Sequence, residues 1–214
     1  MAIGWGFIGT GNYPNSRVAP AAASAEDTSI IAAYSRDQQR ADEFGKTHGA
    51  LAAYTSVEEL LADSRVDVVF VASPNNLHAS HVQLAAKAGK HILVEKAMAT
   101  TVAEVQQIGK LAEDKGLVAM VGHTFLYNLA VRYVKTLIDN GKLGDIRYIY
   151  SQRLNLGRIR DDVDALWNLA PHDISIIQYW LNEPEPIKID KIGMDYVQKG
   201  IDNVTFMNIT YPNN

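Results

Sequence analysis

Residues 3–12 of the chain read IGWGFIGTGN, an apolar run followed at once by two closely spaced glycines. The run predicts a strand. The glycines have the spacing that opens the dinucleotide-binding fingerprint, a tight turn and then a close approach of backbone to pyrophosphate. Pro14 stands where the third glycine of that fingerprint would fall. The alternative is that the two glycines only form a turn and bind no ligand. The expected pyrophosphate contacts are Gly9, Thr10, Gly11 and Asn12.

The first half of the chain alternates short apolar strands with helices. Residues 66–72 are almost continuously apolar and β-branched, which is typical of a parallel strand covered on both faces. The pattern predicts a doubly wound Rossmann domain over residues 1–122, with right-handed crossovers. We predict strands at 3–8, 29–34, 66–72, 92–94 and 117–122, and helices at 17–25, 37–49, 57–63, 77–88 and 102–115.

The pattern changes after Gly122. Strands without helices between them favour an antiparallel sheet, so residues 123–214 are predicted to form an α+β domain for substrate binding or oligomerisation. The sequence stops where a turn would lead to another strand, which would leave a bare sheet edge. We therefore expect this domain to be incomplete at its C-terminus. We predict helices at 125–140 and 168–181, and strands at 145–154, 187–196 and 204–211.

Composition limits the class of function. The 214 residues carry a formal net charge of −4, which disfavours nucleic acid as a partner. The absence of cysteine excludes a disulfide framework and a thiolate metal site, and it fits the cytoplasm. No run of about 18 or more apolar residues predicts a membrane span. We expect a cytoplasmic protein that acts on a small molecule and has no metal, membrane or nucleic-acid partner.

The end of the second predicted strand bears on the choice of dinucleotide. An acidic residue there favours the ribose of NAD, whereas an arginine accepts the 2′-phosphate of NADP. Ser35 and Arg36 favour NADP through a hydroxyl and a guanidinium. Asp37 could turn to the ribose instead, and Ser35 could simply cap the next helix. We expect NADP, with NAD as the alternative.

Two later loops follow strands of the same predicted sheet. The first reads SPNNLH at residues 73–78, and the carboxyl end of a parallel strand is where nucleotide ligands bind. Asn76 could also cap the following helix, and His78 could be a helix residue without a ligand. The second loop begins with Glu95 and Lys96, which places a reactive lysine beside the dinucleotide. The expected cofactor contacts in these loops are Ser73, Asn75, Asn76, His78 and Glu95.

With these motifs in view, the chain resembles the Gfo/Idh/MocA oxidoreductases, the relatives of glucose–fructose oxidoreductase and inositol dehydrogenase. The resemblance covers the whole chain, and it implies a Rossmann domain followed by a domain with a largely antiparallel sheet. It also implies that Lys96 points at the substrate hydroxyl and the nicotinamide ribose. Ala97 stands where the family usually has a proline after a cis bond. A cis bond before alanine costs about 2.5–4 kcal/mol, so we expect a trans bond or a different aim for Lys96. The supporting segments are residues 9–11, 73–78, 88–91 and 95–96.

The resemblance continues in the second half. Residues 167–174, WNLAPHDI, resemble the family segment that brings an Asp and a His, four apart, to the active site. Asn168 and His172 take these positions, and a spacing of four places both on one helix face. Asn168 is also a good N-cap, and Pro171 is tolerated in a first turn. The helix dipole would then keep His172 neutral, as a general base requires.

Residues 121–128, 148–162 and 165–174 resemble a nucleotide-sugar branch, whose members oxidise the 3-hydroxyl of a UDP-N-acetylglucosamine-like sugar. Arginine forks suit a diphosphate, although the polar stretch around residues 155–164 could also be a solvated loop. The expected substrate contacts are His123, Asn128, Arg153 and Arg158, with Asn155 and Arg160 in the same stretch.

The resulting hypothesis is an NAD(P)-dependent sugar or nucleotide-sugar oxidoreductase, a homo-oligomer if its second domain is complete. His172 takes the hydroxyl proton, Lys96 stabilises the alkoxide, and Asn168 assists at the same site. A non-catalytic dinucleotide-binding regulator and an NAD-dependent glycosidase are the alternatives. The sequence leaves open which sugar is the substrate and in which direction the reaction runs.

Overall fold

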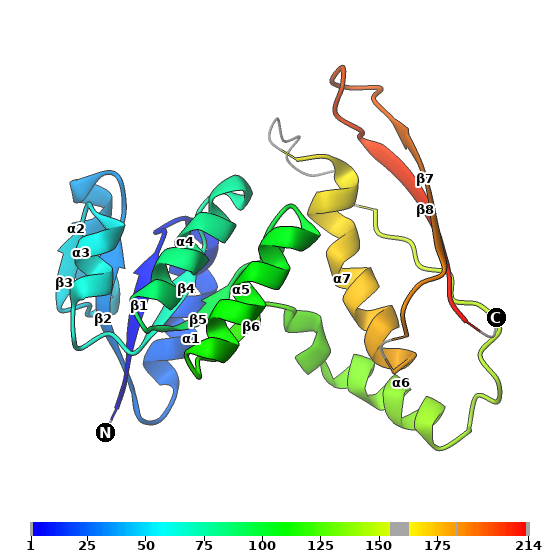
Figure 1. The fold of residues 1–214 in the computed structure, drawn as a ribbon, viewed down its shortest axis with the longest axis horizontal. Helices are drawn as coiled ribbons and strands as arrows, with labels where there is room; N and C mark the ends of the chain where they lie inside the picture. The colour runs from blue at the N-terminus through cyan, green and yellow to red at the C-terminus, as the bar shows by residue number, and fades with distance from the viewer. Residues whose placement is uncertain (1, 155–162, 183, 213–214) are drawn as a thin grey trace. The chain divides into compact units, whose positions relative to one another are not determined.

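The computed structural model describes residues 2–154, 163–182 and 184–212. They divide into two compact units, Met1–Gly122 and His123–Asn214 (Figure 1). No helix among the described residues is long and apolar enough to cross a membrane.

The first unit is built on a six-stranded sheet in which every neighbouring pair is parallel. The strand order is β3-β2-β1-β4-β5-β6, which confirms the predicted doubly wound fold. The order reverses between β1 and β4, and such a switch point leaves a crevice at the carboxyl ends of the strands. The strands are β1 (Ile3–Ile8), β2 (Thr28–Tyr34), β3 (Ala52–Tyr54), β4 (Val68–Val71), β5 (His91–Val94) and β6 (Ala119–Val121).

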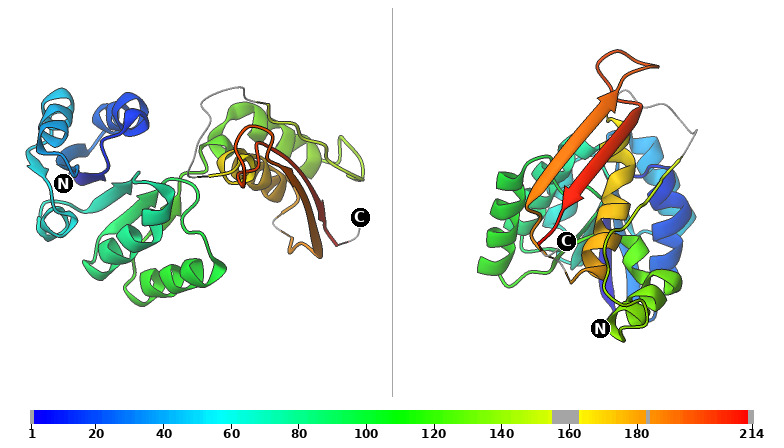
Figure 2. Two further views of the ribbon diagram at one scale, coloured as in Figure 1. Left: turned by 90° about the horizontal axis from the view of Figure 1, so that it is seen from above. Right: turned by 90° about the vertical axis from the view of Figure 1, so that its right-hand side faces the viewer.

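Helices cover both faces of this sheet (Figure 2). Three of them begin where a side-chain oxygen accepts a hydrogen bond from a free backbone N–H. Asp37 caps α2, Ser56 caps α3, and Thr101 forms a reciprocal capping box with Glu104 at α5. Gly49 ends α2 in the left-handed conformation, with φ of 74°. The helices are α1 (Ala19–Ser24), preceded by the π-helical turn η1 (Pro14–Val18), α2 (Gln38–His48), α3 (Val57–Ala62), α4 (Asn75–Lys87) and α5 (Val102–Asp114).

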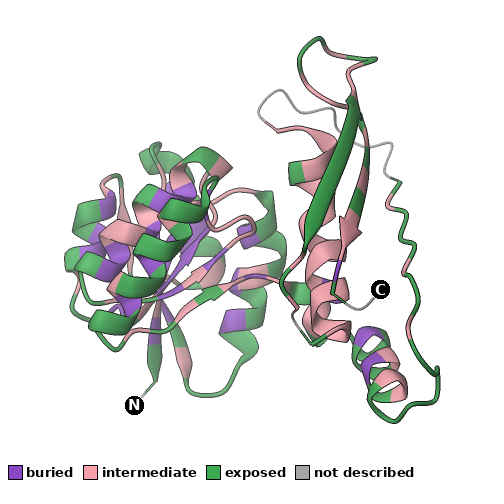
Figure 3. Ribbon diagram, turned by 45° about the vertical axis from the view of Figure 1, so that its right-hand side comes forward, coloured by how far each residue is buried: buried purple, intermediate pink, exposed green. Residues whose placement is uncertain are grey.

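Two apolar clusters hold the layers together. Because successive strand residues point to opposite faces, Phe7 and Ile8 of β1 enter different clusters. Phe7 packs with Phe44 of α2, and Ile8 shares its cluster with Val82 of α4 and Ile108 of α5. Figure 3 shows the buried residues gathered in the sheet and on the helix faces that cover it. A rigid sheet of this kind fixes the loops at its carboxyl edge.

The second unit contains helices and one antiparallel strand pair. The pairing of β7 with β8 confirms the predicted antiparallel sheet. The predicted helix at 125–140 is interrupted, because the Asn128 side chain accepts from the Ala130 N–H and starts a new helix there. Residues 145–154 do not form a strand in the structure, and Tyr148 and Tyr150 are exposed. The elements are η2 (Thr124–Tyr127), α6 (Leu129–Asp139), α7 (Ala165–Trp180), β7 (Lys188–Met194) and β8 (Val204–Thr210).

Candidate functional site

The turn after β1 is shaped by Gly9. Its φ of +113° lies in a region that only glycine enters readily. A Cβ at this position would also lie 2.7 Å from the carbonyl oxygen of Ala72, at the end of β4. The Gly9 N–H donates to the carbonyl of Tyr34, at the end of β2, over 3.1 Å. The turn is thus tied to both neighbouring strands, and its glycine is required by the fold itself.

Gly11 differs, because no heavy atom lies within 4 Å of the place that its Cβ would occupy. The helical residues begin directly after it, at Asn12. Pro14, at the position of the missing third glycine, is buried and begins η1. Proline is acceptable there because the N–H that it lacks has no partner in a first turn. Open backbone in front of a helix start fits the pyrophosphate of a dinucleotide.

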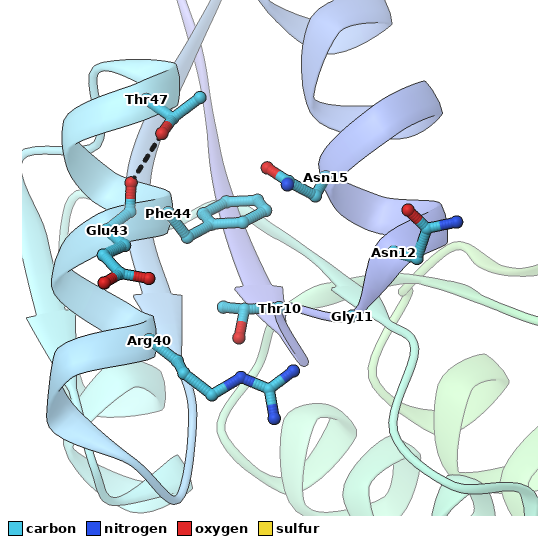
Figure 4. Close-up of a pocket in the computed structure, with 8 residues that line it drawn as sticks. All are labelled: Thr10, Gly11, Asn12, Asn15, Arg40, Glu43, Phe44 and Thr47. Carbon is cyan, nitrogen blue, oxygen red and sulfur yellow. Dashed lines mark hydrogen bonds between the residues drawn. The ribbon is translucent and has the colours of Figure 1, made fainter.

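A pocket of about 310 Å³ lies beside this turn (Figure 4). Figure 4 shows the side chain of Arg40 reaching from α2 toward the turn at Thr10 and Gly11. Arg40 was not predicted from the sequence, although it lies in the first turn of the helix that follows β2. The lining residues are Thr10, Gly11, Asn12, Asn15, Arg40, Glu43, Phe44 and Thr47.

The three residues after β2, Ser35, Arg36 and Asp37, differ in their hydrogen bonds and exposure. Asp37 is the N-cap of α2, since its carboxylate accepts from the Arg40 N–H over 3.2 Å. The idea that Ser35 caps this helix is therefore wrong. The Ser35 hydroxyl instead accepts from the Asp37 N–H over 3.3 Å, and Arg36 is exposed to solvent. The carboxylate that would contact the ribose of NAD thus accepts a hydrogen bond from the helix, while Arg40 lines the pocket.

The loop after β4 leads into α4, which begins at Asn75. Pro74 precedes the helix without a side-chain cap, so Asn76 does not cap it as expected. Asn76 is exposed, and Ser73 and Asn75 are partly buried. His78 is only 1% exposed, and its ring nitrogens each lie 2.7 Å from a backbone carbonyl oxygen, Nε2 from Ser73 and Nδ1 from Ala97. The ring thus joins two loops.

The loop after β5 carries Glu95 and Lys96. The peptide bond between Lys96 and Ala97 is cis, so of the two alternatives given above the trans bond is wrong. The Glu95 N–H donates to the carbonyl of Val71 over 2.9 Å, which anchors this loop to β4. Burial raises the pKa of the Glu95 carboxyl. A Cβ on Gly122 would lie 3.2 Å from Glu95 Oε1, so the carboxyl packs against the end of β6.

In the second unit, α7 begins earlier than expected. Its N-cap is Asp164, whose carboxylate accepts from the Trp167 N–H over 2.8 Å, and Pro171 lies inside the helix. Asn168 is therefore not the cap, and His172 lies about two turns beyond the helix start rather than in its first turn. The proposed action of the helix dipole on His172 does not apply there. The His172 ring lies edge-on to Phe125, with centroids 4.9 Å apart.

The expected substrate residues are partly engaged within the unit. Arg153 donates through Nε to Asp173 over 2.6 Å, and its guanidinium lies 4.9 Å from the Phe125 ring centroid. Burial alone would raise the pKa of Asp173, but hydrogen bonds from Arg153 and Ser151 lower it overall. Arg153 is thus held by a carboxylate.

Five further residues were expected to contact substrate or to lie in the same polar stretch. His123 is half-buried, and burial lowers the pKa of its imidazole. Asn128 caps α6. Arg158, with Asn155 and Arg160, lies outside the described residues.

A glycine turn at the carboxyl edge of a doubly wound sheet defines a dinucleotide-binding class of protein. Residues 3–123 match the model of the Gfo/Idh/MocA oxidoreductase family with an NAD-binding Rossmann fold, and the chain belongs to this family.

Two curated relatives and two solved structures are similar to this chain in sequence or in fold. The chain is 32% identical over 190 residues to trans-1,2-dihydrobenzene-1,2-diol dehydrogenase of Oryctolagus cuniculus, which covers 86% of the chain and 57% of the relative. It is 32% identical over 162 residues to dTDP-3,4-didehydro-2,6-dideoxy-alpha-D-glucose 3-reductase of Streptomyces violaceoruber, covering 76% and 47%. The chain thus spans about half the length of these two relatives.

A 3-ketoreductase from Actinomadura kijaniata, solved with NADP, has a TM-score of 0.65 and 32% identity, covering 69% of the chain and 47% of that protein. A protein of gentamicin A biosynthesis, solved with NAD, has a TM-score of 0.85 at 18% identity, covering 99% and 63%. The second likeness concerns the fold alone.

Proposed function

We propose that the chain binds NAD(P) through its first unit and contributes to an oxidoreductase that acts on a sugar or nucleotide sugar. The observation that carries this proposal is the pair of glycines after β1. Gly9 is demanded by the fold, whereas Gly11 faces open space in front of a helix start. Nothing in the packing of the protein explains the second glycine, but the close approach of a pyrophosphate does.

NADP is the preferred cofactor in this proposal. Arg40 supplies a guanidinium group in the lining of the pocket, and Arg36 supplies an exposed one just after β2; such groups bind phosphate through forked hydrogen bonds. The engagement of Asp37 as a helix cap removes the carboxylate that would favour NAD. The Actinomadura 3-ketoreductase solved with NADP supports the same preference.

The pyrophosphate is assigned to Gly9, Thr10, Gly11 and Asn12, and the loops after β4 and β5 are assigned to the nicotinamide half. In a doubly wound sheet each half of the fold holds one mononucleotide, so the second half takes the nicotinamide. The loop residues in this assignment are Ser73, Asn75, Asn76 and Glu95.

The chemistry follows from Lys96 and His172. The nicotinamide, when bound, accepts or supplies the hydride. Lys96, in the loop after β5, stabilises negative charge on the substrate oxygen, an effect worth a few kcal/mol. His172, in the second unit, is assigned the role of general base or acid for a substrate hydroxyl. Asn168, one turn earlier on α7, hydrogen-bonds the substrate from the same helix face.

The substrate is assigned to the second unit, and His123 is assigned as one of the residues that contact it. Relatives that act on a diol and on a dTDP-sugar support a ring hydroxyl or ketone as the reacting group. Arg153 and Asn128 are engaged with Asp173 and with α6, so their part is to shape the unit around the substrate.

The test is hydride transfer monitored at the nicotinamide absorbance with a panel of UDP-sugars, dTDP-sugars and cyclic diols. The Lys96→Met variant should bind NADPH with unchanged affinity and lose turnover. Lys87→Met, which removes an exposed lysine at the end of α4, is the matched control and should change neither quantity. Normal turnover in the Lys96 variant would refute the role of this lysine.

A further inference from the structure

His78 lies between two loops of the first unit and contacts the backbone of both. It belongs to the first turn of α4 and is almost fully buried. Its Nε2 lies 2.7 Å from the carbonyl oxygen of Ser73, and its Nδ1 lies 2.7 Å from that of Ala97. Both distances are those of good hydrogen bonds.

The two contacts together restrict the protonation of the ring. A carbonyl oxygen only accepts, and a neutral imidazole carries a proton on one of its two nitrogens. With a neutral ring, one carbonyl would face a nitrogen lone pair at 2.7 Å inside the protein, where unpaired polar groups are costly. Both contacts are hydrogen bonds only when both nitrogens donate.

The two carbonyls belong to the loops that follow β4 and β5. Ser73 follows β4, and Ala97 follows directly after Lys96. The His78 ring therefore connects the end of one central strand to the peptide unit that carries the reactive lysine. The residues that line the pocket beside the turn after β1 do not include His78, Ser73 or Ala97.

We propose that His78 is a positioning residue, an imidazolium that donates to Ser73 and Ala97 and thereby fixes the two loops around the nicotinamide. This inference rests on the proposed function. His78 does not touch the cofactor in this scheme, and it acts through the loops that it holds. Its loss should therefore weaken the nicotinamide half of the site and leave the adenosine half intact.

The first experiment detects which nitrogens of the His78 ring carry a proton in the wild-type chain. Long-range ¹⁵N–¹H NMR near neutral pH distinguishes protonated from bare ring nitrogens, and the signals of His78 are identified by their loss in His78→Gln. We expect two protonated nitrogens. One protonated and one bare nitrogen would overturn the proposal, and this result does not depend on whether the variant folds well.

The second experiment compares two ligands, NADPH and 2′,5′-ADP, by titration. His78→Gln should bind NADPH about tenfold more weakly, as expected for loss of a charged hydrogen-bonding group, and should bind 2′,5′-ADP normally. His91→Gln, at the opposite end of β5, is the control and should bind both ligands normally. An equal loss for both ligands, or no loss for either, would contradict a positioning role. A wild-type chain that binds neither ligand would overturn the proposed function instead, whereas the NMR result would still report on the link.

Discussion

Gly9 and Ala72 approach each other so closely that a Cβ on Gly9 would lie 2.7 Å from the Ala72 carbonyl oxygen. Two residues further on, Gly11 has no heavy atom within 4 Å of its own Cβ position. One glycine of the turn therefore serves the packing of β1 against β4, and the other lies in open space, where we place the pyrophosphate in the proposed function.

The two glycines should respond differently to the same substitution. Gly9→Ala should lower the free energy of unfolding by at least about 1 kcal/mol, because it meets both a positive φ and a backbone atom. Gly11→Ala should change stability by less than about 0.5 kcal/mol and still reduce NADPH affinity at least about tenfold. Urea unfolding and an NADPH fluorescence titration measure the two effects. Normal NADPH binding by folded Gly11→Ala would contradict the pyrophosphate assignment.

The sequence was sufficient for the parts of the fold that depend on local chemistry. The caps Ser56 and Gly49 lie where propensity predicts them, and the apolar run at β4 is buried on both faces. It failed where two local choices were equally good. Asp164 and Asn168 are both favourable caps, and only the structure reveals that α7 begins at the first. Residues 145–154 alternate like a strand, but a strand also needs a partner, which no local pattern reports.

The candidate site divides in the same way. The turn at Gly9 could be read from spacing, because the chemistry of a phosphate-binding turn is contiguous in sequence. Arg40 could not, since it reaches the pocket from the next helix. The link from His78 to Ala97 could not either, because it spans 19 residues and ends on a backbone carbonyl.

Arg40 should determine the choice of cofactor. Arg40→Gln should weaken NADPH binding by about 1.5–3 kcal/mol, the value of a hydrogen bond to a charged group, and leave NADH binding unchanged. Lys46→Gln removes the same charge from α2 at a residue that does not line the pocket, and it should have little effect. Isothermal titration calorimetry with NADPH and with NADH measures the affinities of both variants and of the wild type. Equal losses for NADPH and NADH would argue against a 2′-phosphate contact.

The pair of Asp63 and Arg65 should make stability depend on pH. Hydrogen bonds from Arg65 hold the pKa of the Asp63 carboxyl well below its usual range. A depressed pKa contributes stability that is complete above the unfolded value of about 3.9 and is lost as pH falls toward the folded value. Asp63→Asn should therefore be less stable than wild type at pH 7, and the difference should shrink below about pH 4.

Urea unfolding at several pH values tests this. Asp114→Asn, which removes an exposed carboxylate, is the control and should change the unfolding free energy little at any pH. A difference for Asp63→Asn that stays constant down to pH 2 would show that the ion pair is not responsible.

The capping box at α5 should be measurable as stability alone. Thr101→Ala removes the oxygen that accepts from the Glu104 N–H and should cost about 0.5–2 kcal/mol. Glu104→Gln keeps a side chain that can close the box and should cost less. Thermal unfolding followed by circular dichroism measures both variants. A larger loss for Glu104→Gln than for Thr101→Ala would contradict this account of the helix start.

The central claim is that this chain binds a nicotinamide dinucleotide at the carboxyl edge of its six-stranded sheet, with NADPH preferred. The most direct measurement is a fluorescence titration of the purified chain with NADPH and NADH, alongside a circular-dichroism spectrum. We expect saturable binding of NADPH, at least about tenfold tighter than that of NADH. A folded spectrum with no binding of either dinucleotide would contradict it.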